Sequence, residues 1–312
     1  MGSVIVIAGP TCVGKSKTAI ALAKRIGGEI VSADSMQVYR GMDIGTAKLP
    51  GYMRAGVPHH MIDVADPKDD YSVSRFAEDA VKAVESILSR GRVPIVTGGS
   101  GFYIDALLYK QPEMEPGTDP ELKYELRIRA ADGQLQEMYE ELRRLDPEYA
   151  ESIHPNNRVR IIRALEYTLT TGIPYSEYAG KRKTPVPRFD HHFFVLDDDR
   201  RALYKRIDER VDTMIRSGLT DEVSSLIRKG VSRDSVAMQG VGYRQIYDHL
   251  IEDMPLDEAI ASIKTETRHI AKRQLTWLRR IDEAEWINIS TYGRDPQRVA
   301  EHIQSELSHP SG

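Results

Sequence analysis

Residues 9–16, GPTCVGKS, have the composition and spacing of a phosphate-binding segment. They match the pattern G-x4-G-K-[ST] and lie between an apolar run and an amphipathic stretch. The backbone N–H groups of such a loop surround a phosphate, and the helix that follows adds positive potential. Lys15 can reach a terminal phosphate, and the Ser16 hydroxyl can hold Mg²⁺. The segment therefore predicts a phosphate-binding loop (P-loop) formed by Gly9, Pro10, Thr11, Cys12, Val13, Gly14, Lys15 and Ser16.

The P-loop predicts a diphosphate or a triphosphate as ligand, without deciding for ATP. Many P-loop proteins place a second acid after an apolar strand, but the run Arg92–Thr97 ends in two glycines. Asp197 follows a later apolar run and opens an acidic turn. Two roles fit Asp197, a metal-binding acid or part of a solvated turn that caps the helix expected from Arg200, and the pattern favours the second. Cys12 fits a small loop-filling residue better than a catalytic thiol.

Asp34 is a second candidate for chemistry. It follows the apolar run Ile30–Ser32 and so lies at the carboxyl edge of the expected sheet, where open α/β sheets bind their ligands. A carboxylate at this place can take a proton from an acceptor nucleophile. It can equally cap a turn, so the position of Asp34 alone leaves both roles open.

Alternating strands and helices are expected to position these residues. Short apolar runs predict strands and amphipathic spacing predicts helices. The expected strands are Val4–Ala8, Ile30–Ser32, His59–Val64, Arg92–Thr97, His192–Leu196 and Trp286–Ile289, and the expected helices are Lys17–Ile26, Tyr71–Arg90, Arg200–Ser217 and Leu256–Ile281. This alternation predicts an α/β fold, a P-loop NTPase-like doubly wound parallel sheet.

A helical insertion is expected within this α/β core. Two Pro-rich segments, Gln111–Pro120 and Gly180–Asp190, read as linkers around a stretch that is helical from Glu121 to about Thr171. The predicted domains are a catalytic core of residues 1–115 and 190–312 and a helical insertion domain of residues 116–189. The tail after Ser305 is small and polar and is expected to fray.

Composition restricts the class of protein. The 312 residues carry a formal net charge of −4, which taken globally argues against nucleic-acid binding. Basic residues nevertheless outnumber acidic ones in two stretches, 154–190 and 264–280. The single cysteine, Cys12, leaves no internal disulfide and no cysteine-based zinc site, and a cytoplasmic location is expected. No apolar stretch approaches the roughly 18–20 residues of a membrane helix, so no membrane partner is expected.

Further motifs along the chain are specific in combination. They are DSMQVYRGMDIGTAK (34–48), VPHHMID (57–63), GGSGFYI (98–104), HPN (154–156), RALE (163–166), QGVGYRQ (239–245), TR (267–268) and AKRQLTWLR (271–279). Together with the P-loop, they resemble the tRNA dimethylallyltransferase (tRNA isopentenyltransferase, or IPP transferase) family. The resemblance spans nearly the whole chain.

The resemblance implies prenyl transfer. The family moves a dimethylallyl group from dimethylallyl diphosphate to N6 of the adenosine at tRNA position 37, 3′ of the anticodon, in tRNAs that read codons beginning with U. The P-loop would then hold the diphosphate of the donor, with Mg²⁺ as cofactor on Ser16; whether ATP also binds there stays open. By the same resemblance Asp34 is the general base, Thr11 bonds the departing oxygen and Arg210 binds the diphosphate. A monomer is expected.

The resemblance also implies contacts with the anticodon stem-loop of tRNA. The residues at the matching positions are Asp34, Ser35, Met36, Gln37, Ser100, Lys123, Val159, Arg160, Ile161, Ile162, Arg163, Gln239, Gly240, Val241, Gly242, Tyr243 and Arg244. Ser100 replaces a more usual Thr and keeps its hydroxyl. Lys123 replaces a frequent Arg, which weakens a bidentate phosphate contact. Arg206 lies four residues before Arg210, so both can point at one anion, although pairing with Asp208 or Glu209 is the alternative.

Three other functions share parts of this pattern. A small-molecule or nucleotide kinase has the same P-loop, an acid after the second strand and a helical lid that carries arginines. An adenylate isopentenyltransferase acts on free AMP or ATP, but needs no extended basic surface. A non-catalytic RNA-binding ATPase would not need the full set of acid, loop and arginines.

Overall fold

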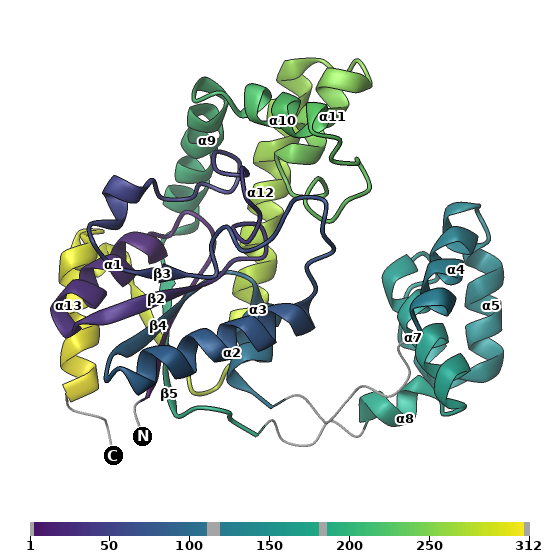
Figure 1. The fold of residues 1–312 in the computed structure, drawn as a ribbon, viewed down its shortest axis with the longest axis horizontal. Coiled ribbons are helices and arrows are strands. Elements are labelled where there is room, and N and C mark those ends of the chain that lie inside the picture. Colours follow the sequence, from purple (N-terminus) through teal and green to yellow (C-terminus); the bar gives the residue numbers. More distant parts are fainter. Residues whose placement is uncertain (1–2, 111–118, 181–185, 309–312) are drawn as a thin grey trace. The chain divides into compact units, whose positions relative to one another are not determined.

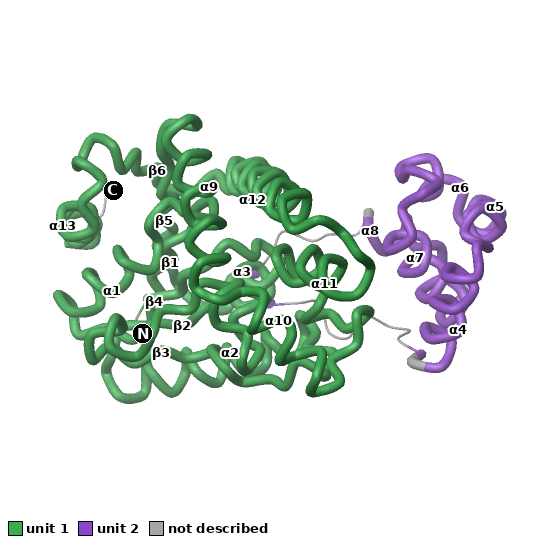
Figure 2. The backbone as a smooth tube through the Cα atoms, turned by 90° about the horizontal axis from the view of Figure 1, so that it is seen from above, with its two compact units in different colours: residues 1–109, 187–312 green, residues 110–186 purple. Residues whose placement is uncertain are grey.

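The computed structural model describes residues 3–110, 119–180 and 186–308 (Figure 1). The chain forms two compact units, one of Met1–Tyr109 with Pro187–Gly312 and one of Lys110–Val186 (Figure 2). The insertion was expected at 116–189, so both boundaries differ from the prediction by a few residues. Residues 111–118 of the first expected linker and residues 181–185 of the second, with the basic Lys181, Arg182 and Lys183, lie outside the described residues.

The larger unit contains a six-stranded sheet in which every neighbouring pair is parallel. The strands are β1 (Val4–Ala8), β2 (Gly28–Ala33), β3 (His59–His60), β4 (Val93–Gly98), β5 (His191–Asp197) and β6 (Glu285–Asn288), in the order β3-β2-β4-β1-β5-β6. The predicted parallel α/β sheet is thus confirmed. The third strand is shorter than the predicted His59–Val64 because Met61 and Asp63 adopt positive φ angles, which end the extended conformation.

Helices cover both faces of this sheet (Figure 1). The helices of the larger unit are α1 (Lys15–Ile26), α2 (Val73–Ser89), α3 (Gly101–Leu108), α9 (Arg200–Arg216), α10 (Leu219–Arg228), α11 (Tyr243–Ile251), α12 (Leu256–Leu278) and α13 (Pro296–Ser308), with short 3-10 turns at η1 (Gly51–Arg54) and η2 (Ile289–Tyr292); α10 and α11 pack on α9 and α12 beyond the sheet. The strand side chains alternate between two cores: Ile5 and Ile7 pack with α1 and α13, whereas Val4 and Val6 pack with α2 and α3. No helix of the described residues is long and apolar enough to cross a membrane.

Several helix ends differ from the prediction. Helix α1 begins at Lys15 rather than Lys17, because Gly14 adopts a positive φ of 108° as its N-cap. Helix α12 ends at Leu278 rather than Ile281. The tail after Ser305 does not fray at once, since α13 continues to Ser308 with its apolar side on the core.

The smaller unit is a bundle of short helices, and the continuous helicity expected from Glu121 to Thr171 is wrong. Its helices are α4 (Pro120–Ala131), α5 (Leu135–Leu145), α6 (Pro147–Glu151), α7 (Arg158–Thr171) and α8 (Tyr175–Gly180). Gly133 interrupts the first pair with a φ of +84°. The side chains of Asp146 and Asn157 cap α6 and α7 by accepting backbone hydrogen bonds.

The carboxyl edge of the sheet brings three loops together. Gly98 of β4 is in register with Ala8 of β1 and with Ala33 of β2. A Cβ atom on Gly98 would lie 2.1 Å from the carbonyl oxygen of Ala33, so only glycine permits this spacing. The P-loop, Asp34 and the turn at Ser100 consequently leave the sheet side by side, where ligands of such sheets bind.

Candidate active site

The P-loop has the backbone geometry that a phosphate cradle requires. Gly9 adopts a φ of +150°, and a Cβ there would lie 2.5 Å from the carbonyl oxygen of Leu196. Gly14 adopts a φ of +108°, and Cys12 also has a positive φ, 65°. These positive φ angles turn the chain tightly between β1 and α1. The free N–H groups of the first turn of α1 can therefore bind an anion at the end of the loop.

Lys15 lies inside the loop with its ammonium group partly withdrawn from water. Its Nζ donates a 2.7 Å hydrogen bond to the carbonyl oxygen of Pro10. Burial lowers the pKa of Lys15 to about 8, against the opposing effect of the negative charge of Asp34. An anion bound beside this ammonium would favour its protonated form.

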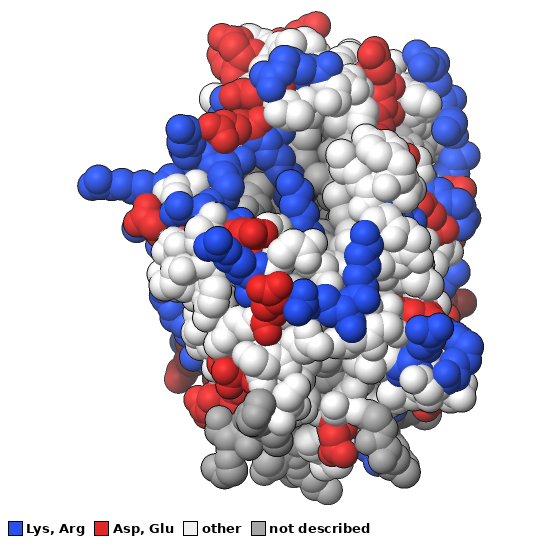
Figure 3. Space-filling view, turned by 90° about the vertical axis from the view of Figure 1, so that its left-hand side faces the viewer, with Lys and Arg blue, Asp and Glu red and all other residues white. Residues whose placement is uncertain are grey.

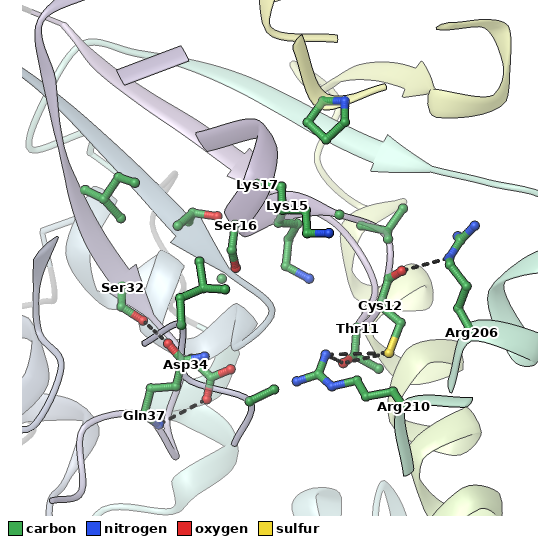
Figure 4. Close-up of a pocket in the computed structure, with 18 of the residues that line it drawn as sticks. Thr11, Cys12, Lys15, Ser16, Lys17, Ser32, Asp34, Gln37, Arg206 and Arg210 are labelled. Atoms are coloured by element: carbon green, nitrogen blue, oxygen red, sulfur yellow. Dashed lines mark hydrogen bonds between the residues drawn. The ribbon is translucent and has the colours of Figure 1, made fainter. Parts of the chain in front are cut away.

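A cavity of about 520 Å³ opens above the P-loop, a volume within the usual range for small ligands. Among the residues that the structure describes, its charged lining comprises Lys15, Lys17, Arg206, Arg210 and Arg294 with a single carboxylate, Asp34. On the face seen in Figure 3, Lys and Arg side chains gather along a hollow. In Figure 4 Asp34 and Gln37 lie on one side of the cavity, with Lys15 and Ser16 between them and the arginines. The excess of positive charge suits a polyanionic ligand.

Asp34 presents one carboxylate oxygen to its own loop. Its Oδ1 accepts hydrogen bonds from the backbone N–H groups of Met36 (2.9 Å) and Gln37 (3.3 Å). Among the described residues, Oδ2 has no hydrogen-bond partner. Asp34 therefore both caps a turn and lines the cavity, so the two roles expected for it are compatible.

Neighbouring side chains fix the loop that carries Asp34. The Ser100 Oγ accepts from the backbone N–H of Ser35 (3.0 Å) and donates to the Ser35 Oγ (3.2 Å). The Gln37 Oε1 accepts from the Ser32 Oγ (3.2 Å), and its Nε2 donates to the carbonyl oxygen of Thr46 (3.2 Å). Ser35, Gln37 and Ser100 thus hold the loop, whereas a contact with tRNA stays a prediction for each.

Arg210 reaches the cavity from α9. Its Nη1 contacts the Thr11 Oγ1 at 3.4 Å and the Cys12 Sγ at 3.5 Å, and its Nη2 donates to the carbonyl oxygen of Thr46 at 3.4 Å. The alternative of surface pairing is wrong, because Asp208 pairs with Arg268 and Glu209 with Lys205. Arg210 is thereby aimed at the P-loop.

Arg206 does not share this arrangement with Arg210. Its Nη1 pairs with Asp198 at 2.6 Å and its Nε donates to the carbonyl oxygen of Cys12 at 3.0 Å. Arg294 pairs with the same carboxylate at 2.8 Å. Burial alone raises the pKa of Asp198, but the hydrogen bonds from Arg294 and Arg206 outweigh it and lower that pKa. Arg206 therefore anchors the P-loop to the end of β5.

The expected acidic turn is only partly as predicted. Asp199 caps α9 by accepting from the N–H groups of Arg201 and Ala202. Asp198, however, is buried rather than solvated. Asp197 accepts from the N–H of Asp198 and is not among the residues that line the cavity, so its position gives no support to a metal role.

Gln274 on α12 was missed as a site residue, although its motif was noted. Its Oε1 accepts from the N–H of Thr11 (2.8 Å), and its Nε2 donates to the carbonyl oxygen of Gly99 (3.0 Å). One side chain therefore connects the P-loop with the exit of β4. The motif AKRQLTWLR that contains Gln274 was the available signal, and it did not show that this side chain faces the P-loop.

The segment 239–244 lies against the Asp34 loop. A Cβ on Gly240 would lie 2.5 Å from the Cε of Met36, so this glycine permits close approach to protein as well as to any ligand. The Gln239 Nε2 donates to the carbonyl oxygen of Arg233 (2.7 Å). Tyr243 is buried, and its hydroxyl donates to Glu222 (2.6 Å). The protein itself encloses the Tyr243 side chain, and the expected contact of Tyr243 with tRNA stays a prediction.

Residues 159–163 were expected to contact tRNA as a group, but they divide by helix face. Val159 and Arg160 are exposed, whereas Ile161 and Ile162 belong to the core of the smaller unit and cannot offer their side chains. Arg163 lies 3.6 Å from the buried carboxylate of Glu166. Lys123, on the neighbouring helix α4, lies 3.8 Å from that carboxylate. Both cations thus lie close enough to Glu166 to offset its buried negative charge.

Two sets of residues could be considered for a metal ion. The Ser16 hydroxyl and the Asp34 carboxylate are oxygen donors that line the cavity, which fits Mg²⁺ held mainly by phosphate and water. Glu285, His302 and Glu306 lie close together elsewhere. There the His302 nitrogens face both carboxylates, at 3.5 and 3.7 Å. The adjacent His59 and His60 bond to different partners, the carbonyl oxygen of Val57 and the carboxylate of Glu29.

Two family models match the sequence. One, described as "IPP transferase", matches residues 37–281, and the other, described as "Isopentenyl transferase", matches residues 2–50. The tRNA dimethylallyltransferase of Pelotomaculum thermopropionicum is 42% identical over 299 residues, covering 96% of this chain and 94% of the relative. That of Thermomicrobium roseum is 45% identical over 310 residues, covering 99% and 92%.

Solved structures give the same result. The chain is similar to the tRNA isopentenylpyrophosphate transferase from Bacillus halodurans, with a TM-score of 0.73 and 37% identity over 99% of this chain and 97% of that one. It is also similar to a eukaryotic dimethylallyltransferase described as acting on tRNA, with a TM-score of 0.83 and 29% identity over 100% of this chain and 81% of the other.

Proposed function

The chain belongs to the IPP transferase family, and from this premise we propose that it transfers a dimethylallyl group from dimethylallyl diphosphate to tRNA. The acceptor is N6 of the adenosine at position 37, 3′ of the anticodon, in tRNAs that read codons beginning with U. The observation that supports this best is one cavity that contains the P-loop, Arg210 and a single carboxylate, Asp34. Such a cavity combines an anion site with one proton acceptor.

The P-loop side of the cavity would bind the diphosphate of the donor. Lys15 and the N–H groups at the start of α1 face the position of the anion. Arg210 lies over the opposite side, in contact with Thr11. Because the Thr11 oxygen already accepts from Arg210, its own hydrogen is free to donate to the departing oxygen. These groups stabilise the negative charge that develops as diphosphate leaves.

Mg²⁺ is proposed as the cofactor, with Ser16 as its protein ligand. When bound, it would neutralise charge on the diphosphate oxygens. Asp34 is the only carboxylate that lines the cavity among the described residues, so phosphate oxygens and water would supply most of the ligands.

Asp34 is proposed as the general base. The exocyclic amine of adenine is a poor nucleophile, because its lone pair is delocalised into the ring. In the proposed step the bond from N6 to C1 of the prenyl group forms, the bond from C1 to the diphosphate oxygen breaks, and the N6 proton moves to Asp34. Its Oδ2 is suited to this, because the turn occupies only Oδ1.

The adenosine must leave the stack of the anticodon loop to reach Asp34, at a cost of a few kcal/mol. Residues at the matching positions that are exposed or partly exposed are proposed to bind the RNA, namely Gln239 and Arg244 in the larger unit and Val159 and Arg160 in the smaller one. Gly240, Val241 and Gly242 are proposed to contact it through their backbone. These contacts predict binding that weakens as salt rises.

Among the alternative functions, a kinase agrees best with the composition of the cavity. The cationic lining would accept ATP as well as another polyanion, so ATP would compete with the prenyl donor for the P-loop. The family match over residues 37–281 favours prenyl transfer. If the acceptor were free AMP, the exposed Arg160 and the partly exposed Arg244 would have no role in binding it.

The test is incubation of the full chain with dimethylallyl diphosphate, Mg²⁺ and unmodified tRNA, followed by mass spectrometry of the nucleosides. We expect N6-dimethylallyladenosine, and none with a tRNA that carries guanosine at position 37. Parallel reactions contain ATP with tRNA, or the prenyl donor with AMP. Turnover of ATP without prenyl transfer, or modification of AMP but not of tRNA, would refute the proposal.

We further propose that the enzyme acts as a monomer in the cytoplasm. The described residues that line the cavity come from the larger unit of one chain, which supports a site built by a single copy. Cys12 lies within the P-loop, which suits a reducing compartment. Light scattering of the protein with and without tRNA would show whether a single chain is the active form.

A further inference from the structure

Glu222 on α10 binds a loop to which the proposed reaction assigns no role. Its Oε2 accepts from the backbone N–H groups of Asp43 (2.9 Å) and Ile44 (2.8 Å). Its Oε1 accepts from the N–H of Gly45 (3.1 Å) and from the hydroxyl of Tyr243 (2.6 Å). An ionised carboxylate has about four acceptor sites, so this one is fully used. Glu222 is therefore a fixed anchor for residues 43–45.

The anchored loop continues directly into the cavity. The carbonyl oxygen of Thr46, the next residue, accepts from the Gln37 Nε2 at 3.2 Å and from the Arg210 Nη2 at 3.4 Å. Gln37 and Arg210 both line the cavity, on opposite sides of it. A shift of residues 43–45 would thus move the acceptor that both side chains share.

Tyr243 connects this anchor with the segment 239–244, which is proposed to contact tRNA. Its ring packs on Gly45, where an added Cβ would lie 2.5 Å from the ring. Three residues earlier, Gly240 packs on Met36 with a comparable closeness. The segment therefore touches the protein on both sides of the site, beside Asp34 and beside Thr46. A displacement of segment 239–244 would therefore shift both Asp34 and Thr46.

We propose that Glu222 and Tyr243 are positioning residues. They couple the binding of tRNA at segment 239–244 to the binding of the diphosphate by Arg210. This inference rests on the proposed function, because it takes tRNA and a diphosphate as the two ligands. Neither residue touches a reactant; both act through residues 43–46. Coupling of this kind is reciprocal, so each ligand must tighten the binding of the other by the same factor.

Two conservative variants separate this role from a general contribution to folding. Tyr243→Phe removes one hydroxyl and keeps the ring that packs on Gly45. Glu222→Gln keeps the shape, but its NH₂ group cannot accept from Gly45 or Tyr243. Asp221→Asn is the matched control. Asp221 is exposed in the same turn of α10, and this substitution removes one negative charge, as Glu222→Gln does.

The assay measures the affinity for inorganic diphosphate by calorimetry, with and without an RNA of the anticodon stem-loop sequence. In the unaltered protein and in Asp221→Asn we expect the RNA to tighten diphosphate binding at least fivefold. In Tyr243→Phe and Glu222→Gln that factor should fall towards one. Transfer to tRNA should lose about tenfold to a hundredfold in kcat/KM, the range for loss of a charge-assisted hydrogen bond.

Thermal unfolding of each variant distinguishes positioning from stability. A variant that unfolds at a lower temperature but keeps the full coupling factor would overturn the inference, as would a factor of one in the unaltered protein. Failure of the unaltered protein to transfer a prenyl group at all would instead refute the proposed function. Transfer by the unaltered protein together with unchanged kcat/KM in both variants would refute the inference alone.

Discussion

Replacement of Asp34 by Asn separates acceptance of a proton from the geometry of the loop. The Oδ1 of Asp34 accepts from the N–H groups of Met36 and Gln37, at 2.9 and 3.3 Å. Asparagine keeps a carbonyl oxygen for both bonds, but its amide group cannot take the proton of the attacking amine. The Asp34→Asn variant should therefore fold and bind donor normally, yet fail in transfer.

The size of the effect follows from this division. General-base catalysis contributes about 100- to 10,000-fold, which is about 3–5 kcal/mol on the barrier. We expect the single-turnover rate of transfer to labelled tRNA to fall by that factor. Diphosphate affinity should change by less than about tenfold, because one charge across a partly hydrated cavity is worth about 1 kcal/mol. Single-turnover kinetics and calorimetry measure the two quantities separately.

The variant Asp34→Ala serves as the structural control. It loses both hydrogen bonds of the turn, which should lower the free energy of unfolding by about 1 kcal/mol and the melting temperature by about 2–4 °C. Asp34→Asn should melt at the temperature of the unaltered protein. Transfer by Asp34→Asn within about threefold of the unaltered rate would show that Asp34 is not the base. Equal loss of stability in both variants would show that Asn does not preserve the turn.

Three further predictions follow from groups around the cavity. Because burial lowers the pKa of Lys15 to about 8, diphosphate should bind more weakly as pH rises through 8. Calorimetry at pH 8 in buffers of different ionisation enthalpy should show uptake of about half a proton, and no uptake would contradict the assignment. The pKa of Asp198 is lowered by its two arginine partners, so its stabilising effect is present at neutral pH and is lost as pH falls through that lowered pKa. Asp198→Asn should lower the free energy of unfolding, measured in urea at pH 7, by about 3 kcal/mol. It should also reduce the loss of stability at acidic pH, and an unchanged loss would refute this. Gly98→Ala places a carbon 2.1 Å from the Ala33 carbonyl oxygen and should destabilise by at least about 2 kcal/mol, whereas Gly51→Ala meets open space and should change the melting temperature little.

The sequence predicted the sheet well because its signals are local. Each buried strand is a short apolar run with side chains in a core on both faces, so β1, β2, β4 and β5 could be found without knowledge of their neighbours. The helix breaks of the smaller unit depend on single residues, such as Gly133 and the caps Asp146 and Asn157, within a stretch that is helical in composition. The apolar periodicity continues across these residues, so periodicity alone does not predict where each helix ends.

The site was predictable where a motif fixes its geometry and not where distant segments meet. The P-loop follows β1 and Asp34 follows β2, and both strands pair with β4, so their proximity follows from topology. Gln274 reaches Thr11 across 263 positions, and Glu222 reaches Ile44 across 178, which no pattern of spacing reveals. In the opposite direction, the resemblance marked whole intervals as tRNA contacts. It did not show which side chains point inward, so Tyr243 was assigned to RNA although it is buried.

Helix α12 shows why the net charge of a segment is an incomplete guide to its partners. Residues 264–280, the C-terminal part of α12 and the two arginines after it, are strongly basic, which suggests an RNA-binding surface. Yet Lys264 pairs with Asp212 at 2.6 Å and Arg268 with Asp208 at 2.7 Å, both acids of α9. The same α9 carries Arg210, and the same α12 carries Gln274, which holds the P-loop.

These ion pairs therefore fix the distance between the two halves of the anion site. Partly buried pairs of this kind contribute little net stability, because desolvation offsets much of their attraction. Their value lies in the register they impose between two helices. Cations without an ion pair among the described residues remain farther along the helix, at Lys272 and Arg273. Helix α12 thus serves first as a support for the P-loop, through Gln274 and through its two ion pairs with α9.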